Sequence, residues 1–310
     1  MTTLVIGGTG FIGYRLIRLL AARGERIVCM DINPGAHSFA DLGDAVRVIR
    51  GDVTQFDNVM AAFVDAKPDR AVNLSYLLGD HPPHFALKLN IVGMDNCFEA
   101  ARLAGVRRVV YASSLAVNGQ QRHYGDRPVT EEDFRHGDYQ YAVHKAFNEW
   151  QARDYNTKYG MCITGIRPAN VTGPDKVRGS VDHVNIITNP ARGQAITLPH
   201  ADAMRCPIHV DDAAEVFARV LMTDAPKHAV YNTGGTSISL GEIAAIVREF
   251  LPDARIAFEA ATGGRDASGN HMIDNSRLVR EFGVQYRPYR ERVRQIINDV
   301  RRQEGLPPVG

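Results

Sequence analysis

The sequence lacks several features that define whole classes of protein. Its 36 lysine and arginine residues are balanced by 35 aspartate and glutamate residues, which leaves a net charge of +1. No run of five or six like charges occurs, so nucleic acid is not indicated as a partner. No segment reaches the roughly 18 consecutive apolar residues that cross a bilayer. We therefore expect neither a nucleic-acid partner nor a membrane span.

Cysteine and metal-ligand motifs are also scarce. The spacing of the four cysteines fits neither a disulfide framework nor a zinc motif. Reduced thiols, an N-terminus without a basic lead-in and the missing membrane span predict a cytoplasmic protein. His81 and His84 flank two prolines, which argue against a regular helix there, and no third ligand has a suitable spacing. We predict no metal site. The cysteines are Cys29, Cys97, Cys162 and Cys206.

Short apolar runs alternate with longer amphipathic stretches over the first half of the 310 residues. Runs that are apolar at nearly every position are typical of parallel strands buried on both faces of a sheet. With helices between them, they predict a doubly wound α/β domain. The predicted strands cover residues 4–6, 26–30, 46–49, 71–74, 108–111 and 161–166.

The alternation ends after Ile166, where a loop-rich stretch with several prolines and glycines reaches Pro199. This change in composition marks a second, smaller lobe. A helix over 211–223 and a strand near 229–231 indicate a return to the sheet, and helices over 240–250 and 289–303 are expected in the smaller lobe.

A glycine-rich turn connects the first strand to the first helix. Gly7, Gly10 and Gly13 recur every three residues. Missing side chains allow a pyrophosphate to approach the backbone, and the helix N-terminus offers it free N–H groups. Asp31 ends the second strand, where a carboxylate can accept hydrogen bonds from an adenosine ribose. No arginine follows between Ile32 and Ser38, so the pattern predicts NAD in preference to NADP.

A tyrosine and a lysine lie one helical turn apart. Tyr141 and Lys145 fall within a long helical pattern, so both side chains face the same way. A lysine ammonium beside a phenol lowers the pKa of the phenol and allows it to act as a base. Ser113 and Ser114 follow the fifth strand, at the sheet edge where ligands of such folds bind.

Together these motifs resemble the NAD-dependent epimerase/dehydratase family of the extended short-chain dehydrogenase/reductase superfamily. The resemblance also includes segments 51–53, 90–93, 111–119, 167–174 and 208–212. It implies a Rossmann-type doubly wound parallel sheet, an NAD-binding domain over 1–167 with a return segment at about 206–232, and a smaller C-terminal α/β substrate lobe made of 168–205 and 233–310.

The resemblance also implies roles for single residues. Ser114, Tyr141 and Lys145 match the catalytic group, in which the tyrosine is the acid/base and the lysine holds the nicotinamide ribose. The residues implied to bind NAD are Gly7, Gly10, Phe11, Ile12, Gly13, Asp31, Asp52, Val53, Leu74, Ser75, Asn90, Tyr141, Lys145 and Pro168.

The substrate is left open between two kinds of small molecule. Asn170, Arg205 and Arg265 match places at which sugar-nucleotide enzymes of the family hold a diphosphate, together with Ser114 at the substrate oxygen. The alternative is that Asn170 caps a turn while Arg205 and Arg265 are exposed or paired with Asp202 and Asp266. Leu74–Leu78 instead looks like relatives that dehydrogenate small hydroxy or amino acids, such as L-threonine 3-dehydrogenase.

Three functions follow from these alternatives. Sugar-nucleotide 4-epimerisation is our first hypothesis, and net dehydrogenation of a smaller hydroxy, amino or sugar acid is the second. A catalytically silent NAD-binding regulator is the third, and the intact catalytic group argues against it. Family members dimerise through the helix starting near Asn90 and the helix carrying Tyr141, so we expect a homodimer.

Overall fold

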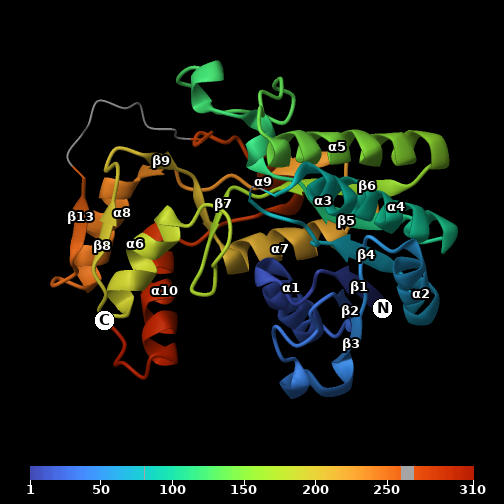
Figure 1. Ribbon diagram of the computed structural model, residues 1–310, viewed down its shortest axis with the longest axis horizontal. Helices are drawn as coiled ribbons and strands as arrows, with labels where there is room; N and C mark the ends of the chain where they lie inside the picture. Colours follow the sequence, from blue (N-terminus) through green and yellow to red (C-terminus); the bar gives the residue numbers. More distant parts are fainter. Residues whose placement is uncertain (80, 260–268) are drawn as a thin grey trace.

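A seven-stranded parallel sheet forms the centre of the larger part of the molecule (Figure 1). The computed structural model describes residues 1–79, 81–259 and 269–310. The strand order is β3-β2-β1-β4-β5-β6-β11, the doubly wound order that brings the carboxyl ends of β1 and β4 together at a switch point. The strands are β1 (Thr2–Ile6), β2 (Arg26–Asp31), β3 (Val46–Arg50), β4 (Arg70–Asn73), β5 (Arg108–Ala112), β6 (Cys162–Arg167) and β11 (Val230–Asn232).

Helices cover both faces of this sheet, and the alternation of side chains along the strands explains the two cores. In β1, Leu4 and Ile6 pack with α2, α4 and α5, whereas Val5 points to the other face and packs with α1 and α7. The covering helices are α1 (Phe11–Ala22), α2 (Phe56–Ala66), α4 (Gly93–Leu103), α5 (Gln140–Tyr159) and α7 (Val210–Leu221).

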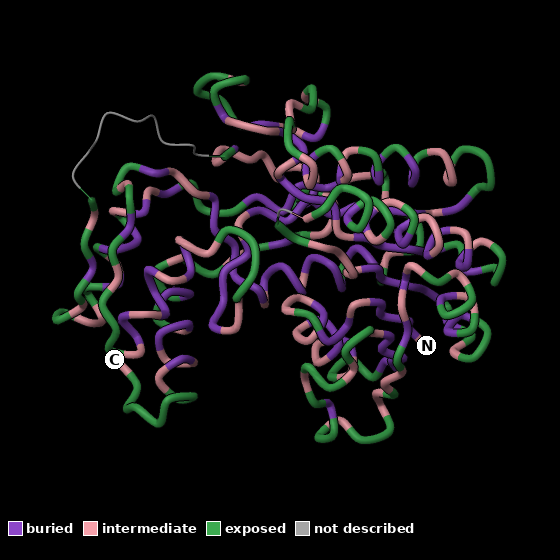
Figure 2. The backbone as a smooth tube through the Cα atoms, in the orientation of Figure 1, coloured by how far each residue is buried: buried purple, intermediate pink, exposed green. Residues whose placement is uncertain are grey.

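The second part of the molecule packs around its own core (Figure 2). Helices α6 (Asp182–Ala191), α8 (Leu240–Phe250) and α10 (Tyr289–Gln303) bury apolar faces against one another. Ser239 and Glu242 form a capping box that begins α8. Three two-stranded sheets accompany these helices: β7 (Asn170–Thr172) with β10 (Pro207–His209), β8 (Ile196–Leu198) with β13 (Ile256–Phe258), and β9 (Met204–Arg205) with β12 (Ile238–Ser239).

The remaining elements are short. They are η1 (Ala40–Ala45), α3 (Pro83–Leu87), η2 (Lys88–Val92), η3 (Leu115–Asn118), η4 (Gln121–His123) and α9 (Ser276–Phe282). Among the helices of the described ranges, none is long and apolar enough to cross a membrane.

The structure confirms the predicted fold class and places strands at the six predicted segments, and α8 and α10 have the predicted bounds. Three local expectations are wrong. The stretch up to Pro199 contains α6, whose last turn holds Pro190. A helix also begins at Pro83, because a proline at the first helical position loses no intrahelical hydrogen bond. Asn90 therefore lies inside the π-helical turn η2, after α3, and not at the start of a helix.

Candidate functional site

The glycine-rich turn is too tight for side chains. Gly7 has a φ of +75°, and a Cβ there would lie 2.5 Å from the backbone nitrogen of Ser75. A Cβ on Gly13 would lie 2.7 Å from the carbonyl oxygen of Gly7. α1 begins at Phe11 without an acidic residue in its first turn. The turn therefore presents free N–H groups and the positive end of the helix dipole, a cradle that fits a pyrophosphate.

Asp31 lies at the carboxyl end of β2, beside this cradle. Its carboxylate accepts hydrogen bonds from the backbone N–H groups of Thr9 (3.1 Å) and Asn33 (3.0 Å). A carboxylate offers about four lone-pair sites, so these two bonds orient Asp31 and leave acceptors for a ribose diol. The site thus fits the adenosine end of NAD.

The other residues predicted to contact the cofactor surround the same edge of the sheet. Asp52 accepts a hydrogen bond from the backbone N–H of Thr54, and Val53 packs against Gly93. The Asn90 amide accepts from the Leu77 N–H and donates to the Leu77 carbonyl. Leu74 and Ser75 follow β4, Ile12 follows Phe11 in α1, and Pro168 follows β6.

Ser114 and Tyr141 are brought together from different elements. Ser114 is the N-cap residue of η3, and its hydroxyl accepts a hydrogen bond from the Ala116 N–H. The neighbouring Ser113 points elsewhere, since it donates to Glu149 at 2.6 Å. Burial raises the pKa of Tyr141 to about 12, and a hydrogen bond from Ser114 acts in the opposite sense. Of the two serines, Ser114 is therefore the one whose side chain lies next to the Tyr141 hydroxyl.

Lys145 is buried beside Tyr141, with only 2% of its surface exposed. Its ammonium donates to the Ala112 carbonyl and lies 5.6 Å from the Tyr141 ring centroid. Burial lowers the pKa of Lys145 well below its usual value, and the negative charge of Glu149 opposes that shift. The amine makes one hydrogen bond among the described residues, so it has further N–H groups for a ligand.

Two further groups around Lys145 escaped the sequence analysis. The ring of Tyr76 lies under the Lys145 ammonium, 3.2 Å from centroid to Nζ. Glu149, one turn after Lys145, accepts two hydrogen bonds from the fully buried Arg167, at 2.7 and 2.8 Å, and one from Arg135. The spacing of Lys145 and Glu149 was a usable signal for the second group, because residues four apart share a helix face.

The predicted substrate residues of the smaller lobe already have partners. Arg205 donates from Nε to both carboxylate oxygens of Asp182, at 3.1 and 3.2 Å, and also from its terminal nitrogen. The expectation that Arg205 is exposed or pairs with Asp202 is therefore wrong. The side-chain Oδ1 of Asn170 accepts a hydrogen bond from the Cys206 N–H at 2.8 Å, which joins β7 to the segment before β10. Arg265 and Asp266 lie outside the described residues.

Asp182 belongs to a larger group that we call the lobe ion cluster: Lys176, Asp182, His183 and Arg205. His183 is fully buried, with Nδ1 3.1 Å from Asp182 and Nε2 3.4 Å from the Lys176 ammonium. Burial lowers the pKa of His183 to about 4 and that of Lys176 to about 8. Asp182 pairs with Arg205, and the Lys176 ammonium contacts the His183 ring and the Val171 carbonyl, so the polar groups of the cluster bond one another inside the protein.

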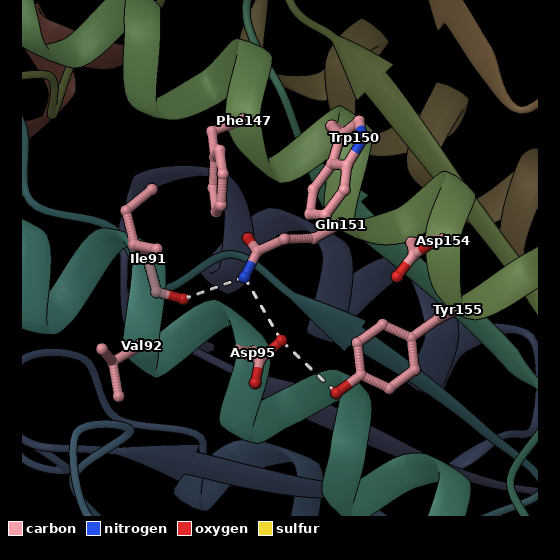
Figure 3. A pocket seen from close by; sticks show the side chains of 8 residues that line it. All are labelled: Ile91, Val92, Asp95, Phe147, Trp150, Gln151, Asp154 and Tyr155. Atoms are coloured by element: carbon pink, nitrogen blue, oxygen red, sulfur yellow. Dashed lines mark hydrogen bonds between the residues drawn. The ribbon is translucent and has the colours of Figure 1, made fainter. Parts of the chain in front are cut away.

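A groove runs between η2, α4 and α5 on the outer surface (Figure 3). Phe147 and Trp150 of α5 stand opposite Ile91 and Val92. At its floor, Gln151 and Tyr155 donate hydrogen bonds to Asp95 at 3.2 and 3.3 Å. Val92, Phe147 and Trp150 are exposed. The groove therefore combines an apolar rim with a polar floor.

Comparison with known proteins identifies relatives of this chain. The model of the NAD dependent epimerase/dehydratase family matches residues 3–234. A UDP-glucose 4-epimerase of Mycolicibacterium smegmatis is 32% identical over 233 residues, which cover 71% of this chain and 72% of that protein.

Solved structures share the fold. A UDP-glucose 4-epimerase of Thermus thermophilus in complex with NAD has a TM-score of 0.84 and 24% identity, covering 97% of this chain and 99% of that one. An L-threonine dehydrogenase of Cupriavidus necator has a TM-score of 0.85 and 22% identity, covering 97% and 100%. At these identities the structures show a shared fold alone, and they include both kinds of enzyme that the sequence left open.

Proposed function

Because the chain belongs to the NAD-dependent epimerase/dehydratase family and is an NAD-dependent enzyme of the extended short-chain dehydrogenase/reductase type, we propose that Tyr141 is its acid/base and that its substrate carries a secondary alcohol. The observation that carries this proposal is the convergence of Ser114, Tyr141 and Lys145 beside the glycine cradle. Bound NAD supplies the hydride acceptor for oxidation and the donor for the return step.

The protein's own residues handle the proton and the orientation of the alcohol. The Ser114 hydroxyl hydrogen-bonds the substrate oxygen, and Tyr141 Oη takes the hydroxyl proton as the carbinol becomes a carbonyl. A positive charge on Lys145 and on the oxidised nicotinamide lowers the pKa of Tyr141 from the value that burial alone gives it. On the return step Tyr141 gives the proton back to the same oxygen.

Sugar-nucleotide 4-epimerisation is the first candidate reaction. It is supported by the Mycolicibacterium relative, a UDP-glucose 4-epimerase. In this reaction the keto intermediate turns over in the site before hydride returns to its opposite face. We propose that residues 1–167, with a return segment at about 206–232, form the part that binds the cofactor. The remaining residues form the substrate lobe, in which the keto intermediate turns over.

A specific observation favours a second candidate, net dehydrogenation of a smaller hydroxy or amino acid. Two of the three side chains expected at a diphosphate already have hydrogen-bond partners: Arg205 donates to Asp182, and Asn170 accepts from the Cys206 N–H. A small substrate needs neither of them. Absorbance of reduced nicotinamide separates the two candidates: incubation with NAD and UDP-glucose leaves it unchanged in an epimerase, whereas accumulation with L-threonine or another hydroxy acid identifies a dehydrogenase.

We also propose a homodimer in which the groove between α4 and α5 (Figure 3) faces the same groove of a second copy. The exposed Val92, Phe147 and Trp150 support this arrangement, since aromatic side chains are enriched at interfaces. Light scattering after size exclusion is the test. We expect a dimer that Trp150→Glu converts to a monomer, and a monomeric unmodified protein would contradict the proposal.

The free thiols of all four cysteines are consistent with a cytoplasmic site of action.

A further inference from the structure

Tyr76 is packed into the catalytic group from the segment that follows β4. Its ring lies directly under the Lys145 ammonium, with 3.2 Å between the ring centroid and Nζ. The Tyr76 ring also packs against the Tyr141 ring in an edge-to-face arrangement, with the two centroids 5.4 Å apart and the ring planes at 88°. An ammonium over the face of an aromatic ring is stabilised by the negative charge of that face, and the effect grows when water is excluded.

The position of Tyr76 is fixed from both sides. Its hydroxyl donates to Asn148 Oδ1 at 3.0 Å, and the Asn148 amide donates to the Asn90 carbonyl at 3.0 Å. The Asn90 side chain holds the adjacent residue, Leu77, through two hydrogen bonds. Ser75, on the other side, lies against Gly7 of the cradle. The ring is therefore tied to the cofactor turn and to α5 at once.

Tyr76 is not a second acid/base. Its hydroxyl points to Asn148, and burial, reinforced by the nearby Tyr141 and Tyr111, raises its pKa far above that of an exposed tyrosine. The face of the ring, and not the hydroxyl, contacts the catalytic lysine.

We propose that Tyr76 is a positioning residue of the catalytic group, whose ring holds the Lys145 ammonium next to Tyr141 and stabilises its positive charge. The proposal rests on the assignment of Tyr141 as the acid/base. Among the described residues, Lys145 makes one hydrogen bond, to the Ala112 carbonyl. The face of the Tyr76 ring is therefore the second close contact that stabilises the buried ammonium. A charged Lys145 in turn favours the phenolate form of Tyr141.

Other ionisable groups near the pair set the background for this effect. Glu149 attracts the Lys145 charge, but its carboxylate is shared with Arg167 and Arg135. Tyr139 acts on Tyr141 and raises its pKa slightly further. Tyr111 lies near Tyr76 and Glu149. None of these groups contacts the Lys145 ammonium as Tyr76 does, so replacing Tyr76 isolates the contribution of the ring.

The test measures the pKa of Tyr141 in the complex with NAD, by NMR of ring-labelled tyrosine, with the signal assigned as the one missing in Tyr141→Phe. Tyr76→Phe keeps the ring and is expected to leave this pKa within a few tenths of a pH unit. Tyr76→Leu removes the aromatic face and is expected to raise it by about one pH unit, because Lys145 loses its charge more readily. Tyr159→Leu removes a tyrosine that faces Arg102 on the outer part of α5 and is expected to have no effect.

Ring-fluorinated phenylalanines at position 76 keep the shape and weaken the ring face stepwise, so they test the proposal even if Tyr76→Leu unfolds. A stepwise rise of the Tyr141 pKa supports it. An unchanged pKa across the fluorinated series, or an equal rise in Tyr76→Phe, overturns it and leaves Tyr76 as a packing residue. Full turnover of Tyr141→Phe is a separate outcome, which overturns the proposed acid/base itself.

Discussion

Lys145 of the catalytic group and Arg205 of the smaller lobe are held in different ways. Lys145 has a carbonyl oxygen and an aromatic ring as its close partners, whereas the Arg205 guanidinium donates from two nitrogens to the Asp182 carboxylate. An ammonium with few polar partners is ready for a ligand. A guanidinium that is already paired must exchange its partner first. Under the proposed function, this difference predicts that the cofactor side is ready for its ligand, whereas the smaller lobe must rearrange before Arg205 can bind an anion.

The largest expected effect tests the catalytic half. Tyr141→Phe removes the proton acceptor and leaves the ring, so turnover should fall by about 10²–10⁴-fold, while NAD affinity and thermal stability change little. Steady-state kinetics measures the fall in turnover, and calorimetric titration measures the affinity for NAD. Undiminished turnover would show that the proton goes elsewhere.

Removing a buried cation should also distinguish the two regions. Arg167→Met leaves Glu149 buried without its main partner, and we expect the free energy of unfolding to fall by about 3–5 kcal/mol. Arg205→Met acts on a pair that is partly exposed, at 15% and 24% of the side chains, and should cost about 1 kcal/mol. Urea denaturation measures the free energy of unfolding of both variants. Equal decreases in Arg167→Met and Arg205→Met would contradict this prediction.

Acid should destabilise the smaller lobe through His183. Its pKa is about 4 in the folded protein, against 6.5 for a free histidine. Between these values the unfolded chain binds a proton that the folded chain does not, so stability falls as the pH decreases from 6.5 to 4, by roughly 3 kcal/mol in total. His183→Gln should reduce this pH dependence and leave the part that comes from His209, whose pKa burial also lowers to about 4, and the exposed His84→Gln should not change it. A flat profile in the unmodified protein would refute the assignment.

The smallest expected effect concerns cofactor choice. Asp31→Asn weakens the acceptor facing the ribose and removes a charge that repels a 2′-phosphate. NAD affinity should fall roughly tenfold, the value of one charged hydrogen bond, and NADP affinity should rise. Calorimetric titration with both dinucleotides measures this, with the exposed Asp253→Asn as the control. Unchanged preference would place the ribose contact on another residue.

Local patterns made the catalytic half predictable from the sequence. The glycine spacing, the position of Asp31 after β2 and the four-residue spacing of Tyr141 and Lys145 act over a single turn or strand end. They depend little on the rest of the chain, and the apolar runs predicted the strands because a parallel sheet is buried on both faces.

The remaining contacts join residues that are distant in the sequence. Asp182 at the start of α6 contacts Arg205 in β9, and Tyr76, which follows β4, contacts Lys145 in α5. No local spacing predicts such pairs. The helix α6 was missed because its Pro190 suggested a loop, although a proline in the last turn breaks few hydrogen bonds.

The most direct test of the difference between the two halves is calorimetric titration of NAD and of UDP-glucose into the unmodified protein and into Asp182→Asn. Both proteins should bind NAD equally, because the cradle and Asp31 are already in place. UDP-glucose should bind about tenfold more tightly to Asp182→Asn, in which Arg205 is free to hold a phosphate. Equal affinity of UDP-glucose for the two proteins, or a loss of NAD binding in Asp182→Asn, would contradict the account.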